Sequence, residues 1–368
     1  MLKIGLVLDD SLDKPDGVQQ YVTILGEYLK SIGHDVHYLV AETMRDDLSN
    51  IHSLTRYASM KFNQNNVRTP LPSSSKTIKS LLSRLDLDVI HVQMPYSPLF
   101  AGKVIRFAPK RTKIVGTFHI LPASKTHALA NIVLRVGIMR SLYKFDKIMA
   151  VSKPAGEFAK RIYGIDSVVV PNCVDLSRFV PTKQIKSHYP TKRIVFLGRF
   201  VKRKGAEELV RALRELVGTY NINNLEVVMA GKGPDLESVK ALAYKMGLKK
   251  IISFPGFIDE DRKANLLQTA DIAVFPSLGG ESFGIVLVEA MAAGAKIVLG
   301  GDNPGYSSVL GDRPELLFNP RDPNVFADKL RTMLLNRDVA SITNWQAEHV
   351  KQFGVAVVAK QILGIYAN

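Results

Sequence analysis

The sequence predicts an α/β protein made of two domains, each with a doubly wound parallel sheet. Its 368 residues exceed the ~150 residues of a typical single domain. Short apolar runs alternate with segments whose apolar residues recur at helical spacing, which is typical of buried parallel strands connected by helices. This alternation fills the first half and starts again at Ile194. We therefore expect two Rossmann-like domains.

Each apolar run is short enough to be one buried strand. The first run, Lys3 to Leu8, precedes a polar loop and a helical pattern from Val18 to Ser31, with Gly33 as its stop signal. The other strands expected in the first half are Val36 to Ala41, Val89 to Val92, Ile114 to Phe118, Ile148 to Val151 and Val168 to Val170. Those expected in the second half are Ile194 to Leu197, Glu226 to Ala230, Ile251 to Phe254, Ile272 to Pro276 and Lys296 to Leu299.

A turn-rich segment starting at Pro171 marks the domain boundary, and the polar stretch from Pro181 to Pro190 precedes the second sheet. We expect residues 1–172 to form the first domain and residues 173–353 the second. Residues 354–368 carry one apolar stripe at helical spacing, so we expect a helix that packs back on the first domain.

The composition excludes several classes of protein. With 46% hydrophobic and 23% charged residues, the chain is not disordered, collagen-like or a coiled coil. Its single cysteine, Cys173, cannot form an internal disulfide, and the first residues lack the apolar core of a signal peptide, so we expect a cytoplasmic protein. The most apolar stretch, Gly284 to Gly300, contains Glu289 and Lys296, so no membrane span is expected.

Positive charge is concentrated in one part of the chain. The net charge is +15, and the segment from Arg56 to Lys144, with fifteen basic and two acidic residues, carries +13. Such a segment attracts anionic lipid head groups, nucleic acid or acidic substrates, or it is a solvated face without a partner.

The densest motif runs from Gly279 to Gly294 and contains two glutamates, Glu281 and Glu289. A glycine-rich loop that leads from a strand into a helix presents free backbone N–H groups, which suit a phosphate. Glu281 lies in this loop, and Glu289, one to two turns into the helix, could accept hydrogen bonds from hydroxyls such as those of a ribose. Plain packing is the alternative.

Further candidates follow other strands. Arg199 and Lys204 come after Ile194 to Leu197, where they could balance a diphosphate without a metal, or form an exposed basic turn. In the first half, Gly17 opens a helix and His119 ends a strand, although a lone histidine is more often structural.

Several motifs are absent or weak. The sequence has no Gly-x-Gly-x-x-Gly after its first strand and no P-loop, which argues against dinucleotide oxidoreductases and P-loop enzymes. Asp86-Leu87-Asp88 looks like a metal-binding motif, but it directly precedes a strand, so we expect a helix-to-strand turn. Potential metal ligands are not otherwise clustered.

Together these motifs resemble those of retaining glycosyltransferases of the GT-B fold, and most closely those of the phosphatidylinositol mannosyltransferases. The matching segments, in chain order, are Asp16-Gly17-Val18-Gln19, Gly116-Thr117-Phe118-His119, Val151-Ser152, Pro171-Asn172, Leu197-Gly198-Arg199, Lys204-Gly205 and Glu281 to Glu289. The resemblance covers nearly the whole chain. It implies an acceptor-binding first domain and a second domain that binds the nucleotide sugar.

The resemblance also implies roles for single residues. Arg199 and Lys204 would hold the donor diphosphate. The residues that would cap it with backbone N–H groups are Phe283, Gly284 and Ile285. Glu289 would bind the ribose, Glu281 and His119 would hold the sugar, and Gly17 would approach the donor. Retention of configuration without a metal ion is implied, and no cofactor beyond the nucleotide sugar. Asp10 stands where the lipid mannosyltransferases have a tyrosine near the inositol.

We therefore expect transfer of mannose from GDP-mannose to a lipid such as phosphatidylinositol by a protein bound peripherally to the inner face of the cell membrane. Alternatives are a UDP-sugar-dependent enzyme making a glycosyl diacylglycerol or another glycan, and a nucleic-acid-binding protein. The last lacks interleaved aromatic residues and a recognition motif. Candidates for contact with anionic lipid are Lys76, Lys79, Arg84, Lys103, Arg106, Lys110, Arg111 and Lys113. The segment from Ala128 to Leu142 is expected to be a buried helix, with membrane insertion as the alternative.

Overall fold

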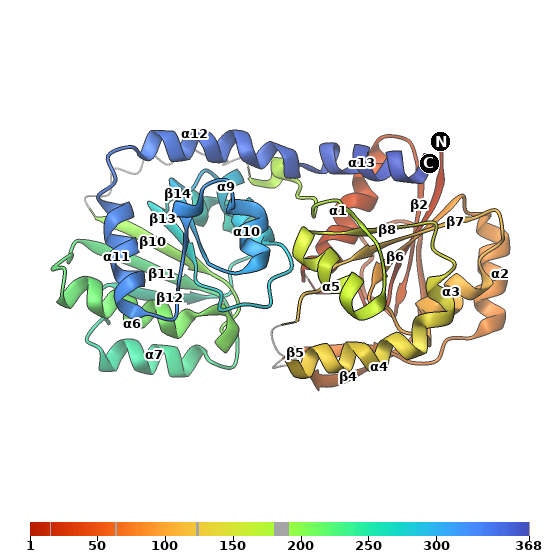
Figure 1. The fold of residues 1–368 in the computed structure, drawn as a ribbon, viewed down its shortest axis with the longest axis horizontal. Helices are drawn as coiled ribbons and strands as arrows, with labels where there is room; N and C mark the ends of the chain where they lie inside the picture. Colours follow the sequence, from red (N-terminus) through yellow and green to blue (C-terminus); the bar gives the residue numbers. More distant parts are fainter. Residues whose placement is uncertain (15, 63–64, 123–124, 180–190, 368) are drawn as a thin grey trace. The chain divides into compact units, whose positions relative to one another are not determined.

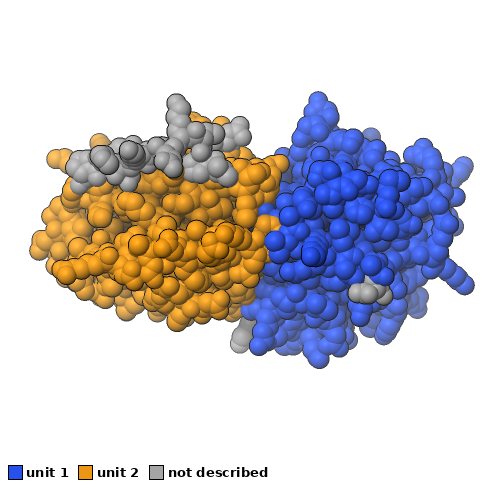
Figure 2. All heavy atoms as spheres, turned by 90° about the horizontal axis from the view of Figure 1, so that it is seen from above, with its two compact units in different colours: residues 1–174, 355–368 blue, residues 175–354 orange. Residues whose placement is uncertain are grey.

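A computed structural model describes residues 1–14, 16–62, 65–122, 125–179 and 191–367. The chain divides into two compact units, which Figure 2 colours separately. Unit 1 comprises Met1–Val174 and Val355–Asn368, and unit 2 comprises Asp175–Gly354. The boundaries expected from the sequence were 172/173 and 353/354. The stretch from Pro181 to Pro190 lies outside the described residues.

Unit 1 contains a seven-stranded parallel sheet with the order β3-β2-β1-β6-β7-β8-β9 (Figure 1). Its strands are β1 Lys3–Leu8, β2 Asp35–Ala41, β3 Ile51–Thr55, β6 Val89–Met94, β7 Lys113–Phe118, β8 Lys147–Ala150 and β9 Val168–Val169. Its helices are α1 Gly17–Ser31, α2 Ser75–Leu85, α3 Ala101–Phe107, α4 Lys125–Leu142, α5 Lys153–Tyr163 and α13 Val355–Ala367. A separate antiparallel pair is formed by β4 Tyr57–Phe62 and β5 Asn65–Pro70.

Unit 2 contains a six-stranded parallel sheet with the order β12-β11-β10-β13-β14-β15. Its strands are β10 Lys192–Leu197, β11 Leu225–Ala230, β12 Ile252–Gly256, β13 Ile272–Phe275, β14 Ile297–Gly301 and β15 Leu317–Phe318. Its α-helices are α6 Ala206–Gly218, α7 Leu236–Lys245, α8 Glu260–Gln268, α9 Ile285–Ala292, α10 Pro304–Leu310, α11 Pro323–Leu334 and α12 Val339–His349. Short 3-10 helices are η1 Leu176–Phe179, η2 Lys202–Lys204, η3 Pro314–Leu316 and η4 Val350–Phe353.

Both sheets are doubly wound, as the alternating pattern predicts. The strand order reverses direction between β1 and β6 in unit 1 and between β10 and β13 in unit 2. In open parallel sheets, ligands bind beside the carboxyl ends of the strands at this switch point. The loops after β1, β6, β10 and β13 are therefore the first places to look for functional residues.

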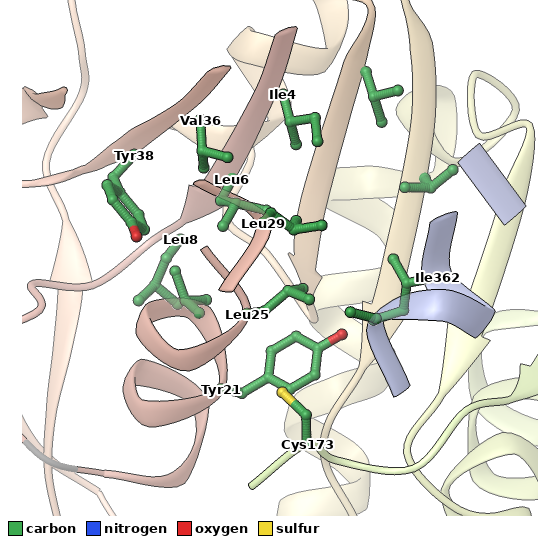
Figure 3. Packing of buried hydrophobic residues seen from close by; sticks show 14 of the residues in the cluster. Ile4, Leu6, Leu8, Tyr21, Leu25, Leu29, Val36, Tyr38, Cys173 and Ile362 are labelled. Atoms are coloured by element: carbon green, nitrogen blue, oxygen red, sulfur yellow. The ribbon is translucent and has the colours of Figure 1, made fainter. Parts of the chain in front are cut away.

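One core of unit 1 joins the first and last helices of the chain (Figure 3). Tyr21 and Leu25 of α1 and Ile362 of α13 are buried with Leu6 of β1, and Cys173 lies beside Tyr21. Removing one such aliphatic side chain from water stabilises a fold by ~1.5–3 kcal/mol. This apolar stripe is why the C-terminal helix belongs to unit 1.

A row of buried polar side chains, connected by hydrogen bonds, crosses the same region. The Oη atom of Tyr366 in α13 lies 2.7 Å from Nδ1 of His91. The other ring nitrogen of His91, Nε2, lies 2.7 Å from Oγ1 of Thr117. Tyr21 Oη lies 3.4 Å from the same Thr117 oxygen. Burial lowers the pKa of His91 to about 3, so the ring is neutral and serves as one donor and one acceptor.

The structure corrects the sequence-based strands at several points. Val168 and Val169 were expected in a buried strand, but they are 52% and 50% exposed because β9 is the last strand of its sheet. The strands β3, β4, β5 and β15 were not expected. In β3, Ile-His-Ser-Leu-Thr mixes polar and apolar residues, so it lacks the apolar run that marks a buried strand.

We predict that Tyr366→Phe lowers the free energy of unfolding by about 1–3 kcal/mol, because the buried His91 Nδ1 loses its hydrogen-bond partner. Urea unfolding followed by circular dichroism measures the change. Tyr143→Phe is the matched control, since Tyr143 is 86% exposed. Equal stability of the two variants would contradict a structural role for this row of buried side chains.

Candidate functional site

The donor-site residues expected in unit 2 lie in the loops at its switch point. Arg199 follows β10, Lys204 ends η2, and Glu281 lies in the loop between β13 and α9. The two loops approach each other closely at Gly205, which has φ +72°, and a Cβ there would meet the carbonyl oxygen of Pro276 at 1.9 Å. Glycine is thus required for the loop to bring Lys204 beside the second loop.

Three donors converge on one oxygen of Glu281. Its Oε1 accepts hydrogen bonds from Arg203 Nη1 at 2.7 Å and from Ser277 Oγ at 2.7 Å. The third donor is Lys204 Nζ, at 2.8 Å. Within the described part of the chain, Oε2 accepts no hydrogen bond, and 13% of the side-chain surface of Glu281 is exposed. One oxygen is therefore anchored by the protein, while the other is available to a ligand.

The surrounding charges hold Glu281 in its ionised form. Burial alone would raise the pKa of this carboxyl, but the charges of Lys204 and Arg203 and the hydrogen bonds to Oε1 outweigh burial and lower the pKa to about 2. Burial lowers the pKa of Lys204, and the positive charges of Arg203 and Arg199 lower it further. The negative charge of Glu281 raises the pKa of Lys204 but does not outweigh these effects. Arg203 and Lys204 at one carboxylate, with the charge of Arg199 acting on Lys204, leave the cluster positive, which suits a diphosphate.

The loop around Glu281 leads directly into α9. Gly284 has φ +145°, and a Cβ there would meet the Tyr306 ring at 2.9 Å, so glycine is needed at this turn. The Phe283 side chain is buried and packs its ring edge against Phe353. The structure shows no acceptor, among the residues it describes, for the backbone N–H groups of Phe283, Gly284 and Ile285. These groups can therefore bind an anion.

Glu289 lies in α9 and is buried, with 6% of its surface exposed. Its Oε1 accepts a hydrogen bond from Lys263 Nζ at 2.9 Å, and the same lysine pairs with Glu260 at 2.8 Å. Burial raises the pKa of Glu289 against the opposing charges of Lys263 and Lys204. The effect of Lys204 links this carboxyl to the cluster at Glu281.

Sequence reasoning missed three residues of this site. Arg203 lies in the basic turn that was recognised, but only the η2 conformation shows that it faces Glu281. Ser277 follows β13 and could have been suspected from its place at a strand end. Lys263 lies in α8, 26 residues before Glu289, and no local pattern links the two.

In unit 1, His119 follows β7 and lies beside the neighbouring strand β6. Its Nε2 lies 2.8 Å from Oε1 of Gln93, so that nitrogen donates, and its ring packs edge-on against Tyr21 with centroids 4.9 Å apart. Burial lowers the pKa of His119 to about 3 against a smaller opposing effect of Asn172. The imidazole is therefore neutral, and it can orient a ligand by hydrogen bonding.

Gly17 and Asp10 lie near the carboxyl end of β1 in the same unit. Gly17 is the first residue of α1 and is exposed. Asp10 accepts hydrogen bonds from Gln19 Nε2 at 3.0 Å and from the backbone N–H of Ser11 at 2.7 Å. Both residues thus occupy the sheet edge that also carries His119.

The structure supports a turn rather than a metal site at Asp86-Leu87-Asp88. Asp86 ends α2 in the left-handed conformation, with φ 53°, and pairs with Arg111. Asp88 accepts a hydrogen bond from the backbone N–H of Lys3 at 2.7 Å. Within the described ranges, no group of three or more His, Cys, Asp or Glu side chains could hold a metal ion.

The basic candidates gather around α2 and α3, which pack against each other (Figure 1). Lys79 Nζ lies 4.7 Å from the ring centroid of Phe107 at the end of α3. Lys103 Nζ donates to the carbonyl of Ser73 at 2.6 Å. The candidates Lys76, Arg84, Arg106 and Lys110 are exposed, Arg111 is exposed but paired with Asp86, and Lys113 is half-buried at the start of β7.

Helix α4 differs from the buried helix that was expected over Ala128 to Leu142. Ile138 is fully buried, but Val136 is 72% and Met139 is 43% exposed, so burial was the wrong expectation for these two positions. The side chains of residues 128–133 lie outside the described set. No helix in the described ranges is long and apolar enough to cross a membrane.

Two family descriptions match the chain, one in each half. Residues 15–178 match Glycosyltransferase Family 4, and residues 182–350 match Glycosyl transferases group 1. Among solved structures, sucrose-phosphate synthase from Thermosynechococcus elongatus has a TM-score of 0.79 at 22% identity, with 100% of this chain and 98% of that chain covered. The Anabaena protein HepE in complex with UDP has a TM-score of 0.77 at 16% identity, with both chains fully covered. These structures share the GT-B fold predicted above.

Curated relatives with one shared name match over most of the chain. Phosphatidyl-myo-inositol mannosyltransferase of Mycolicibacterium smegmatis is 32% identical, covering 99% of this chain and 93% of the relative. The protein of the same name in Propionibacterium freudenreichii is 32% identical and covers 81% of this chain and 76% of the relative. The chain therefore belongs to the glycosyltransferase group 1 family, as a hexosyltransferase related to the phosphatidyl-myo-inositol mannosyltransferases.

Proposed function

We propose that this enzyme transfers mannose from GDP-mannose to a membrane lipid such as phosphatidylinositol, with retention of configuration and without a metal ion. The observation that carries the donor half is the cluster at Glu281, where Arg203 and Lys204 pair with one carboxylate oxygen and the other oxygen is left to a ligand, while the charge of Arg199 acts on Lys204. The names of the full-length relatives support mannose and an inositol lipid. A more distant relative, 23% identical, is named as GDP-mannose-dependent.

The diphosphate of the donor would bind between the cations and the start of α9. Arg199 and Lys204 supply positive charge, and the N–H groups of Phe283, Gly284 and Ile285 supply donors at the positive end of a helix dipole. Glu289 would accept hydrogen bonds from the ribose hydroxyls. These contacts replace the charge compensation that a divalent cation supplies in other nucleotide-sugar enzymes, and no cofactor is required.

The sugar would bind at the free oxygen of Glu281. An ionised carboxylate is an acceptor only, and two hydroxyls of a hexose can donate to one carboxylate oxygen. Because Oε1 is held by three donors, Oε2 is fixed in position before the sugar arrives. The resemblance assigns a further hydrogen bond with the sugar to His119, whose imidazole is neutral in unit 1. Glu281 remains ionised and would act by binding.

The transfer would proceed on one face of the sugar. The bond between the anomeric carbon and the β-phosphate oxygen breaks while the acceptor oxygen bonds to the same face of that carbon. The acceptor proton passes to the departing phosphate oxygen, and GDP leaves. Arg199 and Lys204 stabilise the charge that develops on the phosphate, which is where electrostatic stabilisation contributes most.

The acceptor would be presented at an anionic membrane surface on the cytoplasmic side. Each Lys or Arg near such a surface contributes about 1 kcal/mol of binding, within a Debye length of about 8 Å at physiological salt. The basic residues of α2, α3 and the α3–β7 loop supply this attraction. Asp10, at the end of β1, would lie on the acceptor side.

A transfer assay tests the donor and the metal requirement together. With phosphatidylinositol vesicles, we expect label from GDP-mannose in an α-linked glycolipid and no transfer from UDP-glucose. EDTA should leave the rate unchanged, because the cations of the protein balance the diphosphate. Transfer from UDP-glucose alone would favour the UDP-sugar alternative. Inhibition by EDTA that magnesium or manganese reverses would contradict the metal-free mechanism.

We predict that Glu281→Gln and Lys204→Ala each lower kcat/KM about a hundredfold, because losing one such charged contact costs about 3 kcal/mol in the transition state. Lys202→Ala is the matched control, since Lys202 lies in the same turn but is exposed and outside the cluster. Circular dichroism verifies that the variants fold. Near-normal turnover in either folded variant would rule out the donor-site assignment.

We predict that the protein binds vesicles containing anionic lipid, and that binding falls steeply with salt and with charge reversal at Lys110, Arg111 and Lys113. Binding to neutral vesicles should be weak at every salt concentration, because little besides charge attracts these residues to the surface. Sedimentation with vesicles measures both. Equal binding to neutral and anionic vesicles, or to neither, would instead favour a soluble acceptor.

A further inference from the structure

A pocket lies in unit 1, and none of its lining residues belongs to the loops at the switch point. It has a volume of about 430 Å³, within the ~300–1,000 Å³ typical of small-molecule sites. One wall is β3 and the other is a single face of α2. The lining residues are His52, Ser53, Leu54, Lys76, Thr77, Ser80, Leu81 and Arg84.

The charge of this pocket has one sign. Lys76, Ser80 and Arg84 follow each other at intervals of four residues, so they share one face of α2. The described lining contains no Asp or Glu, and neither Lys76 nor Arg84 pairs with an acidic side chain among the residues that the structure describes. Lys79, on the same helix, lies instead over the ring of Phe107. Two cations and the hydroxyl residues Thr77 and Ser80 therefore line the helical wall of one cavity.

The opposite wall presents a neutral histidine that can take up a proton. Asp35 Oδ1 lies 3.3 Å from His37 Nε2, and His37 Nδ1 lies 3.0 Å from His52 Nε2. With the His37 Nε2 proton donated to Asp35, His37 Nδ1 accepts and His52 Nε2 donates, which leaves the His52 Nδ1 without a proton. Burial, the adjacent His37 and the charge of Arg84 lower the pKa of His52 to about 4.

We propose that the pocket between β3 and α2 binds a phosphate group, either of a soluble phosphate ester or of a phospholipid head group. Arg84 and Lys76 would supply the charge, and Thr77 and Ser80 would donate hydrogen bonds to the phosphate oxygens. The cavity extends beyond one phosphate, so it has room for the group that the phosphate carries. The site is distinct from the proposed diphosphate site of unit 2. Its phospholipid arm rests on the membrane contact proposed above for the basic residues of α2, whereas its soluble-ester arm does not.

Binding of an anion here would change the protonation of His52. The groups that face this histidine are His37 and Asp35 from β2 and Lys76 and Arg84 from α2. A bound phosphate offsets the positive charge of Arg84 and accepts a hydrogen bond from a protonated Nδ1, so it favours the charged ring. The histidine thus reports directly on occupancy of the pocket.

The test uses the full-length protein with isotope-labelled histidine. The Cε1–H resonance of His52 is identified by its absence in His52→Asn, and its pH titration is compared in sodium phosphate and in sodium chloride of equal ionic strength. We expect phosphate to raise the pKa of His52 by at least about one unit and Arg84→Gln to weaken phosphate binding about tenfold or more. Arg161→Gln, the matched control, should change it less than about twofold, because Arg161 lies on α5 over the Phe158 ring and does not line this pocket.

A second arm distinguishes the source of the phosphate. If the pocket takes a lipid head group, vesicles with phosphatidic acid should shift the His52 resonance at a lower phosphate concentration than inorganic phosphate does, and Arg84→Gln should abolish that advantage. If it takes a soluble ester, glycerol phosphate should be the better ligand. Both results support the site. The site would be overturned if His52 titrates identically in phosphate and in chloride and responds to neither ligand. Equal losses of binding in Arg84→Gln and Arg161→Gln would overturn it as well.

Discussion

The carboxylate of Glu281 and the cations around it organise the functional end of unit 2. Arg203 and Lys204 come from the segment after β10, whereas Ser277 and Glu281 come from the segment after β13. These contacts therefore join the two loops at the switch point of the sheet. They require close backbone approach, and a Cβ at Gly305 would meet the carbonyl oxygen of Glu281 at 2.1 Å. The glycines of this region thus allow the close backbone contacts that position the Glu281 side chain.

The two units present different chemistry at the carboxyl edges of their sheets. Unit 2 offers a positive cluster with free N–H groups, which suits the diphosphate of a nucleotide sugar. Unit 1 offers a buried neutral histidine held by Gln93 and Tyr21, which suits hydrogen bonding to an uncharged sugar or alcohol. The positive charge of unit 1 lies instead around α2 and α3. This division agrees with a donor half and an acceptor half acting on a lipid.

Features that depend only on residues close together in the sequence could be predicted from it. The apolar run of β10, the loop with Arg199 and Lys204, and the motif around Glu281 are all local, so their order along the chain could be inferred. Their roles follow from the resemblance and stay predictions. The partner of Glu289 could not, because Lys263 comes from another helix and their contact depends on how α8 and α9 pack. The exposed β9 was missed for a related reason: a strand's place in the sheet order is not encoded in its own residues.

The protein itself keeps Glu281 ionised and oriented before any ligand binds. Infrared difference spectra between the wild type and Glu281→Gln isolate the carboxyl band of this one residue. At pH 3.5 a glutamate with the ordinary pKa of about 4.3 is mostly protonated. With the pKa held at about 2, we predict that the carboxylate band persists at this pH. A protonated carboxyl band that grows in around pH 4 to 5 would contradict the account.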